Sequence, residues 1–201
     1  MRILISGGGI AGMTLAYWLH RDGHMPVIVE RGSGAVSGGY GIDFGGTGYD
    51  VATRMGIADQ LVARQLPVEA AQFVDENGEV YASLHRDLVD RISRSPHLGL
   101  MHGALEDVLA GAIAPDVEFH YGATITAIEQ TSRDVSVTLS DGTQQNFDLV
   151  VGADGVHSRV RELVFGPESG FAHHLGYQVA IHHVGDRFGL GAVRTHFTEP
   201  G

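Results

Sequence analysis

The feature that most constrains the fold is a glycine turn close to the N-terminus. Gly7-Gly8-Gly9-Ile10-Ala11-Gly12 follows a short apolar run, Arg2–Ser6, which is typical of a buried parallel strand. The pattern of Ile10–Arg21 predicts a helix that stops near Gly23, and Pro26–Glu30 predicts a second buried strand. Strand, helix and strand within the first 30 residues predict a βαβ unit, whose crossover is right-handed in nearly all proteins.

The spacing of the turn, G-x-G-x-x-G, suits the diphosphate of a dinucleotide. Gly7 permits a tight turn, Gly9 lets a diphosphate approach the backbone, and Gly12 lets the helix pack closely against the strand. Glu30 follows Gly12 by 18 residues, close to the spacing of about 20 expected for a carboxylate that binds a ribose diol. The turn does not distinguish NAD from FAD, whereas the negative charge of Glu30 disfavours the 2′-phosphate of NADP. The alternative interpretation is an ordinary tight turn of an α/β protein, with Glu30 as a solvated strand end.

The rest of the chain alternates predicted helices with predicted strands. Residues 31–46 are rich in glycine and are expected to be irregular, and Asn77-Gly78 is a strong hairpin signal. The run from Ala123 to Phe147 predicts a β-meander. Further helices are predicted at Thr47–Met55, at Ile57–Arg64, over Leu105–Ala112 and up to Arg161. Further strands are predicted at Val68–Val74, Glu79–Leu84, His97–Met101, Val117–Tyr121, Leu149–Val151, Gly176–Val184 and Leu190–Phe197.

The composition limits the kinds of binding partner and the cellular compartment that we expect. The 201 residues hold 13 Lys or Arg against 24 Asp or Glu, and the net charge of −11 argues against nucleic acid as a partner. The absence of cysteine rules out disulfides, thiolate metal sites and cysteine nucleophiles, and it fits a cytoplasmic protein. Residues 3–20 carry no charged side chain other than histidine, but glycines interrupt them, so neither a membrane span nor a signal peptide is expected. The pairs His173-His174 and His182-His183 lack the third ligand of a zinc site, so no metal site is predicted.

A second signature lies at residues 148–161. The sequence Asp148-Leu149-Val150-Val151-Gly152-Ala153-Asp154-Gly155 predicts a buried strand that delivers one carboxylate to its carboxyl end, where ligands bind in parallel sheets. Val156-His157-Ser158-Arg159-Val160-Arg161 continues into a predicted helix. A lone Asp-Gly pair is also common as a turn that caps a helix, and this interpretation stays open beside the first.

The 148–161 string resembles the Asp-Gly motif of the class A flavoprotein monooxygenases, the FAD-dependent aromatic hydroxylases. The glycine turn and Glu30 match the first motif of the same family. Gly38-Gly39-Tyr40-Gly41-Ile42-Asp43-Phe44, with Gly48-Tyr49-Asp50-Val51 and Arg54-Met55-Gly56, looks like the branch that includes the tetracycline-inactivating monooxygenases. The resemblance covers nearly the whole chain, as the N-terminal half of a family member. It implies an α/β fold, with a Rossmann-like FAD-binding domain of parallel sheet and β-meander beside an incomplete β-rich substrate domain.

The resemblance also implies an oxidoreductase activity. In the family, NADPH or NADH reduces the bound FAD, and molecular oxygen then forms a flavin hydroperoxide that hydroxylates a small aromatic or polyketide-like substrate. The cofactor carries this chemistry, so no catalytic acid or base is assigned. Two alternatives stay open: a flavin-linked or NAD-linked reductase that does not hydroxylate, and a truncated chain that binds FAD weakly or not at all and has no activity.

The resemblance implies a set of cofactor-binding residues. The glycines of the turn would hold the diphosphate, Glu30 would hold the adenosine ribose, and Asp154 would lie near the ribityl and diphosphate part of FAD. The full expected set is Gly7, Gly9, Ile10, Ala11, Gly12, Glu30, Arg31, His102, Asp154 and Gly155.

Three positions depart from the family pattern. An arginine is usual near Val36, and the family's Arg-Gly-Asp-Leu is here His102-Gly103-Ala104-Leu105, which replaces a permanent cation by a histidine. The family's later Gly-Asp motif has no counterpart in the 201 residues, so a truncated substrate domain is expected. The expected domains are residues 1–66 with 97–165 for FAD, and 67–96 with 166–201 for part of the substrate domain.

Overall fold

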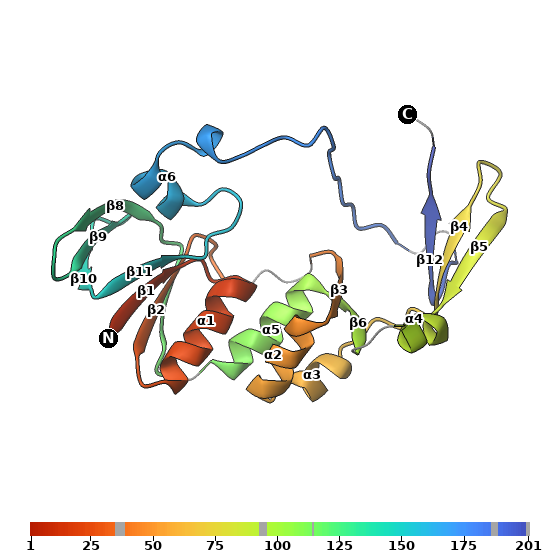
Figure 1. Cartoon of the computed structure of the whole chain (residues 1–201), viewed down its shortest axis with the longest axis horizontal. Coiled ribbons are helices and arrows are strands. Elements are labelled where there is room, and N and C mark those ends of the chain that lie inside the picture. The colour runs from red at the N-terminus through yellow and green to blue at the C-terminus, as the bar shows by residue number, and fades with distance from the viewer. Residues whose placement is uncertain (35–38, 93–95, 114, 186–188, 200–201) are drawn as a thin grey trace. The chain divides into compact units, whose positions relative to one another are not determined.

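The computed structural model describes residues 1–34, 39–92, 96–113, 115–185 and 189–199. The chain divides into two compact units, one made of residues 1–37 and 105–178 and the other of residues 38–104 and 179–201. These units divide the chain at other places than the expected domains, whose bounds stay a prediction. Figure 1 shows the elements of both units with their labels.

The first unit is built on a parallel sheet of four strands in the order β11-β1-β2-β7. These strands are Leu149–Gly152, Arg2–Ser6, Met25–Glu30 and Glu118–Tyr121. Helix α1, Ile10–Arg21, connects β1 to β2, and α5, His102–Ala112, precedes β7. The strand order places the end of β1 between the ends of β2 and β11, so the loops that follow these three strands meet at one edge.

An antiparallel meander completes the first unit. Its strands are β8, Ile125–Gln130, β9, Val135–Leu139, and β10, Gln144–Phe147, in the order β10-β9-β8. Helix α6, Arg159–Phe165, and a 3-10 turn at Glu168–Gly170 follow β11. Apolar side chains of the parallel sheet, the meander and α6 share one core, which contains Leu4, Val27, Val29, Ile125, Val137, Leu139, Phe147 and Val160.

The second unit contains two small sheets. Strand β3, Gly41–Gly45, pairs antiparallel with β6, His97–Met101. The other sheet has the order β12-β4-β5, with β12 at Val193–Phe197, β4 at Ala70–Val74 and β5 at Val80–His85. Its helices are α2, Thr47–Met55, α3, Ala58–Val62, and α4, Arg86–Ile92.

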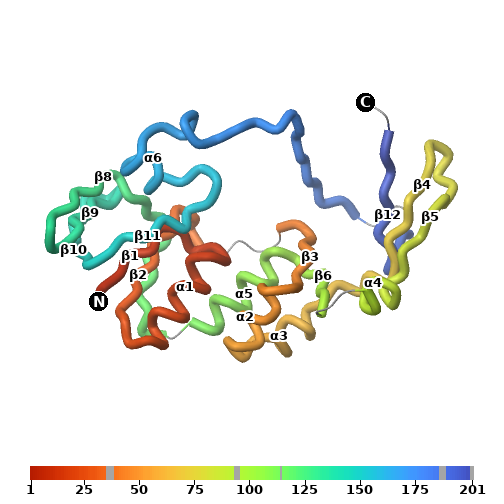
Figure 2. Tube along the Cα trace, in the orientation of Figure 1, coloured from red at the N-terminus to blue at the C-terminus, as the bar shows by residue number. Residues whose placement is uncertain are grey.

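The mixed α/β class with parallel and antiparallel sheets is confirmed, but three local predictions were wrong and one helix was missed. Residues 41–45 were expected to be irregular and form β3, because they pair with β6. The strand predicted at Gly176–Val184 is absent: residues 172–185 form no helix or strand and can be followed as a tube in Figure 2. Leu149 of the strand predicted to be buried is 44% exposed, because β11 is an edge strand of the described sheet. Helix α4 was not predicted from the sequence.

None of the helices in the described ranges is both long and apolar enough to cross a lipid bilayer.

Candidate functional site

One pocket of the first unit lies where the ends of β1, β2 and β11 meet. Its volume of about 250 Å³ is below the roughly 300–1,000 Å³ of pockets that bury a whole drug-sized ligand, so it can hold one part of a larger molecule. The two carboxylates that the sequence singled out both line it, Glu30 at the end of β2 and Asp154 after β11. The full lining is Ser6, Gly7, Gly9, Val29, Glu30, Arg31, Ala123, Thr124, Ala153, Asp154, Gly155, His157 and Arg159.

Gly7 and Gly12 hold the turn together by close approach. Gly7 has a φ of +110°, and a Cβ atom on it would lie 2.4 Å from the carbonyl oxygen of Ala153. A Cβ atom on Gly12 would lie 1.9 Å from the carbonyl oxygen of Gly7. Because atoms cannot approach so closely, both positions require glycine for the packing of the turn, whether or not a ligand is present.

Gly9 differs from these two glycines. A Cβ atom on Gly9 would meet only the Oε1 atom of Glu106, at 3.6 Å, and its φ of −81° suits any residue. The fold therefore does not require glycine here. A ligand can approach the backbone closely only where no side chain stands in the way. Gly9 leaves such an open space beside the pocket.

The first turn of α1 adds the electrostatic part of the site. Gly9 is the N-cap of α1, no side chain caps the helix, and its first turn contains no acidic residue. The amide groups of Ile10 and Ala11 therefore belong to an uncapped helix start, whose dipole favours a negatively charged group. The open face of Gly9 and this uncapped turn fit the diphosphate of FAD.

Glu30 ties two loops to each other. Its Oε2 atom accepts a hydrogen bond from the Gly8 amide at 2.7 Å, and its Oε1 atom accepts one from the Gly32 amide at 2.6 Å. Each carboxylate oxygen has a second lone pair, so both can still accept a hydrogen bond from a ribose hydroxyl. The half-buried carboxylate thus fixes the glycine turn and stays available to a ligand.

Asp154 accepts hydrogen bonds at the start of helix α6, whose N-cap residue is Ser158. Its Oδ2 atom accepts hydrogen bonds from the amides of Arg159 at 2.7 Å and Val160 at 3.0 Å, and the Ser158 hydroxyl donates to Oδ1 at 2.5 Å. The Ser6 hydroxyl donates to Oδ2 over 3.4 Å. The capping interpretation of the Asp-Gly pair therefore describes what the carboxylate does within the protein, and its role toward FAD stays a prediction.

Several lining residues were not among the expected site residues. Arg159 and His157 stand within the 148–161 string, so their place in that motif was the available signal. Arg159 also forms an ion pair with Glu162 at 2.6 Å, and His157 contacts Glu168 at 3.0 Å. Thr124 belongs to neither sequence motif and could not be predicted, because it lies at the start of the meander and reaches the pocket only in the folded chain.

The remaining expected residues are placed as follows. Arg31 and Gly155 line the pocket, Gly12 is buried under the turn, and Ile10 and Ala11 begin α1. His102 belongs to the second unit, where its ring stacks on Tyr40 with centroids 5.2 Å apart, and it does not line this pocket. The position near Val36 lies outside the described residues.

A parallel sheet with a ligand pocket at the ends of its strands, beside an uncapped helix start, defines a dinucleotide-binding α/β domain. Residues 1–180 match the family model described as FAD binding domain. The chain belongs to this family.

Similar proteins agree with this assignment. An uncharacterized protein of Mycobacterium tuberculosis strain H37Rv is 37% identical over 180 residues, which is 89% of this chain and 48% of that protein. A flavin-dependent monooxygenase of Legionella longbeachae is 32% identical over 195 residues, 96% of this chain and 49% of the enzyme. The crystal structure of tetracycline destructase Tet(55) has a TM-score of 0.72 and 34% identity, and covers 81% of this chain and 40% of that structure. The chain thus spans about half the length of the curated relatives it matches.

Proposed function

We propose that the chain is the FAD-binding part of an NADPH- or NADH-dependent monooxygenase that hydroxylates a small aromatic or polyketide-like molecule with molecular oxygen. The observation that carries the proposal is the open face of Gly9 at the uncapped start of α1, between Glu30 and Asp154. The names of the relatives, flavin-dependent monooxygenase and tetracycline destructase, support hydroxylation as the reaction class.

The residues of the pocket suggest how FAD is held. The amides of Gly9, Ile10 and Ala11 would bind the diphosphate, which their free N–H groups and the helix dipole stabilise. Glu30 would accept hydrogen bonds from the adenosine ribose through its unused lone pairs. Asp154 would act mainly as a positioning residue, because it fixes the loop that runs from β11 to α6.

The FAD supplies the redox chemistry and the activation of oxygen when it is bound. The contribution of this chain is to bind the nucleotide end in one orientation, and no side chain is assigned as acid or base. The second candidate, a flavin-linked reductase without hydroxylation, uses the same pocket and differs only in the products formed. A full-length relative carrying this half, assayed for oxygen insertion during NADPH oxidation, separates the two candidates.

FAD binding by this chain is tested with two matched glycine variants. We expect the purified chain to bind FAD with a visible flavin spectrum, and Gly9→Ala to weaken binding at least tenfold while the thermal unfolding temperature stays the same. Gly111→Ala is the control, because Gly111 lies on α5 with no atom within 4 Å of its added Cβ. This variant should bind FAD like the parent chain.

Two results would contradict the proposal. The first is a chain that is folded by circular dichroism and shows no flavin binding in titrations with FAD. The second is equal affinity of the parent chain and Gly9→Ala, which would place the flavin away from the glycine turn.

A further inference from the structure

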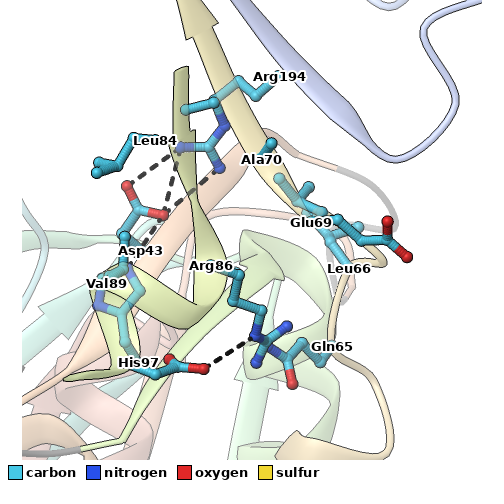
Figure 3. A pocket seen from close by; sticks show the side chains of 14 residues that line it. Asp43, Gln65, Leu66, Glu69, Ala70, Leu84, Arg86, Val89, His97 and Arg194 are labelled. Carbon is cyan, nitrogen blue, oxygen red and sulfur yellow. Dashed lines mark hydrogen bonds and ion pairs between the residues drawn. The ribbon is translucent and has the colours of Figure 1, made fainter.

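The second compact unit contains its own pocket, which is separate from the glycine turn and which the proposed function does not use. Its volume is about 240 Å³, and it lies between the β3–β6 pair, the β12-β4-β5 sheet and α4. Figure 3 shows this pocket with the side chains that line it. All the lining residues belong to the second unit, so the pocket is complete within that unit.

Strand register explains why the pocket exists. Arg194 of β12 lies opposite Ala71 of β4, which in turn lies opposite Leu84 of β5. The three residues therefore form one row across the sheet, with a small residue between two large ones. In the other sheet, Asp43 lies opposite Gly99, which leaves the facing position without a side chain.

Helix α4 supplies the remaining wall. Arg86, Val89 and Asp90 are spaced at i, i+3 and i+4 and so share one face of the helix, and all three line the pocket. Leu66 lies on the wall formed by the segment between α3 and β4. Apolar and charged side chains thus both line the pocket, which suits a compact molecule with an apolar body and a polar group.

The two arginines of the pocket have unused hydrogen-bond donors. Arg194 reaches Asp43 only through long contacts of 3.3 to 3.5 Å. Arg86 contacts Asp90 at 3.5 Å as an ion pair, and no hydrogen bond of its guanidinium group is found among the described residues. A guanidinium group carries five N–H donors in a planar fork, so both arginines can bind further oxygen acceptors.

The carboxylates offer less to a ligand. Asp43 is shared between Arg194 and His97, which lies 3.5 Å away, and Asp90 is paired with Arg86. In Figure 3 the Glu69 carboxylate points away from the two arginines. The pocket therefore offers unused hydrogen-bond donors on its two guanidinium groups, whereas the carboxylates near these groups are already paired.

We propose that this pocket binds a small organic molecule whose apolar body packs on Leu66, Leu84 and Val89 and whose carboxylate or carbonyl oxygens accept hydrogen bonds from Arg86 and Arg194. A basic molecule without an acceptor oxygen cannot use these donors, because guanidinium groups only donate hydrogen bonds. The proposal does not depend on FAD, because the site lies in the other unit.

The test uses 2-naphthoate as a probe, since it combines a two-ring apolar body with one carboxylate. Ligand-observed NMR titrations of the full chain should show saturable binding at one site, with at least tenfold weaker binding of 2-naphthylmethylamine. Saturating ADP should not displace the probe, because ADP carries the diphosphate and ribose suited to the glycine-turn pocket.

Three variants locate the binding. Arg86→Met and Arg194→Met keep an apolar stem and remove the donors, so each should weaken 2-naphthoate about tenfold. Arg91→Met is the matched control, because Arg91 is an exposed arginine on the same helix that does not line the pocket. Ala71→Leu fills the pocket without changing its charge and should abolish binding; far-UV circular dichroism checks the fold of every variant.

The proposal is overturned if the amine and the carboxylate bind equally well, if ADP displaces the probe, or if the Arg86→Met variant binds like the parent. If Arg194→Met does not fold, Arg86→Met and Ala71→Leu still decide the question. FAD binding by the same preparations is read separately, so that failure of the flavin site and failure of this site are distinct results.

Discussion

At the scale of single residues, the glycines of the turn have different reasons to be glycine. Gly7 and Gly12 are required by the protein itself, since an added Cβ atom would meet backbone at 2.4 and 1.9 Å. Gly9 faces open space and is the position at which a ligand would explain the choice. A motif that is usually given one function thus combines a packing requirement with a binding requirement, and mutagenesis can separate the two.

Glu30 gives a prediction at the same scale. The Glu30 carboxylate accepts hydrogen bonds from two backbone N–H groups, one on each oxygen. In Glu30→Gln the side-chain NH2 group, a donor, faces one of these N–H groups, so one hydrogen bond is lost and a repulsive contact replaces it. We expect Glu30→Gln to lower the free energy of unfolding by about 1–3 kcal/mol and to weaken FAD binding. Urea denaturation measures the first effect. Glu129→Gln, at an exposed position of β8, should be neutral, and equal stability of both variants would contradict the assignment.

At the scale of elements, Asp154 and α6 act together. We expect Asp154→Ala to lower stability by about 0.5–2 kcal/mol, the range for loss of a helix cap, because alanine offers no acceptor to the backbone N–H groups of the first turn. Hydrogen exchange of the Arg159 and Val160 amides should quicken first, since these two amides donate to Oδ2.

The control for this variant is Asp107→Ala, which removes an exposed carboxylate on α5. It should leave the exchange of α6 unchanged. Unaltered exchange of the α6 amides in Asp154→Ala would contradict the capping role.

The β4–β5 hairpin provides a pH-dependent element. Backbone hydrogen bonds, first from Glu79 and then from Asn77, lower the pKa of Asp75 below its ordinary value of 3.8. Because the folded-state pKa is lowered, the stabilisation is fully present above pH 3.8 and is lost as the pH falls through the lower folded value. The amides of Asn77 and Glu79 donate to Oδ1 at 2.9 and 2.8 Å, so they are the groups to follow.

The measurement is the amide chemical shift of Asn77 and Glu79 during an acid titration by NMR. In the parent chain both shifts should change as Asp75 is protonated. In Asp75→Asn, which keeps an acceptor and cannot titrate, they should stay constant; titration of these amides in the variant would assign the effect to another group.

Sequence reasoning located most elements, because local patterns determined them. Helix α2 and strand β6 have the predicted bounds, and β8, β9 and β10 lie within the predicted meander, since periodicity and the flanking turns define these elements within a few residues. Strand β3 was missed, because the glycine content of residues 41–45 hides a strand that exists only through pairing with β6. Residues 176–184 have the alternating pattern of a strand but remain irregular, because no strand among the described residues pairs with them.

The site was predictable to a similar degree. Glu30 and Asp154 were predicted to bind one cofactor. They line one pocket, because carboxyl ends of neighbouring parallel strands meet at one edge of the sheet, and their contact with FAD stays a prediction. The capping of α6 by Asp154 could not be chosen over ligand binding, since both use the same Asp-Gly pattern. Thr124 was missed because its approach to the pocket depends on tertiary packing of the meander.

At the scale of the whole molecule, the two units should respond differently to a nucleotide. Trp18 is the single tryptophan of the chain and lies on α1, so its fluorescence reports on the first unit. ADP at one hundred times its dissociation constant should raise the free energy of unfolding detected at Trp18 by about 2.7 kcal/mol, through mass action. Urea denaturation followed by Trp fluorescence is the measurement. In Gly9→Ala, a tenfold weaker affinity should reduce the increase to about 1.4 kcal/mol at the same ADP concentration.

The two hydrogen bonds by which Glu30 links Gly8 to Gly32 affect the rate of nucleotide association and its entropic penalty. The protein's own hydrogen bonds hold both loops on one carboxylate. An incoming nucleotide therefore has fewer backbone torsions left to immobilise, and the entropic penalty of association is correspondingly smaller. We expect the association rate of a nucleotide with this pocket to be limited by diffusion rather than by a slow rearrangement of the polypeptide.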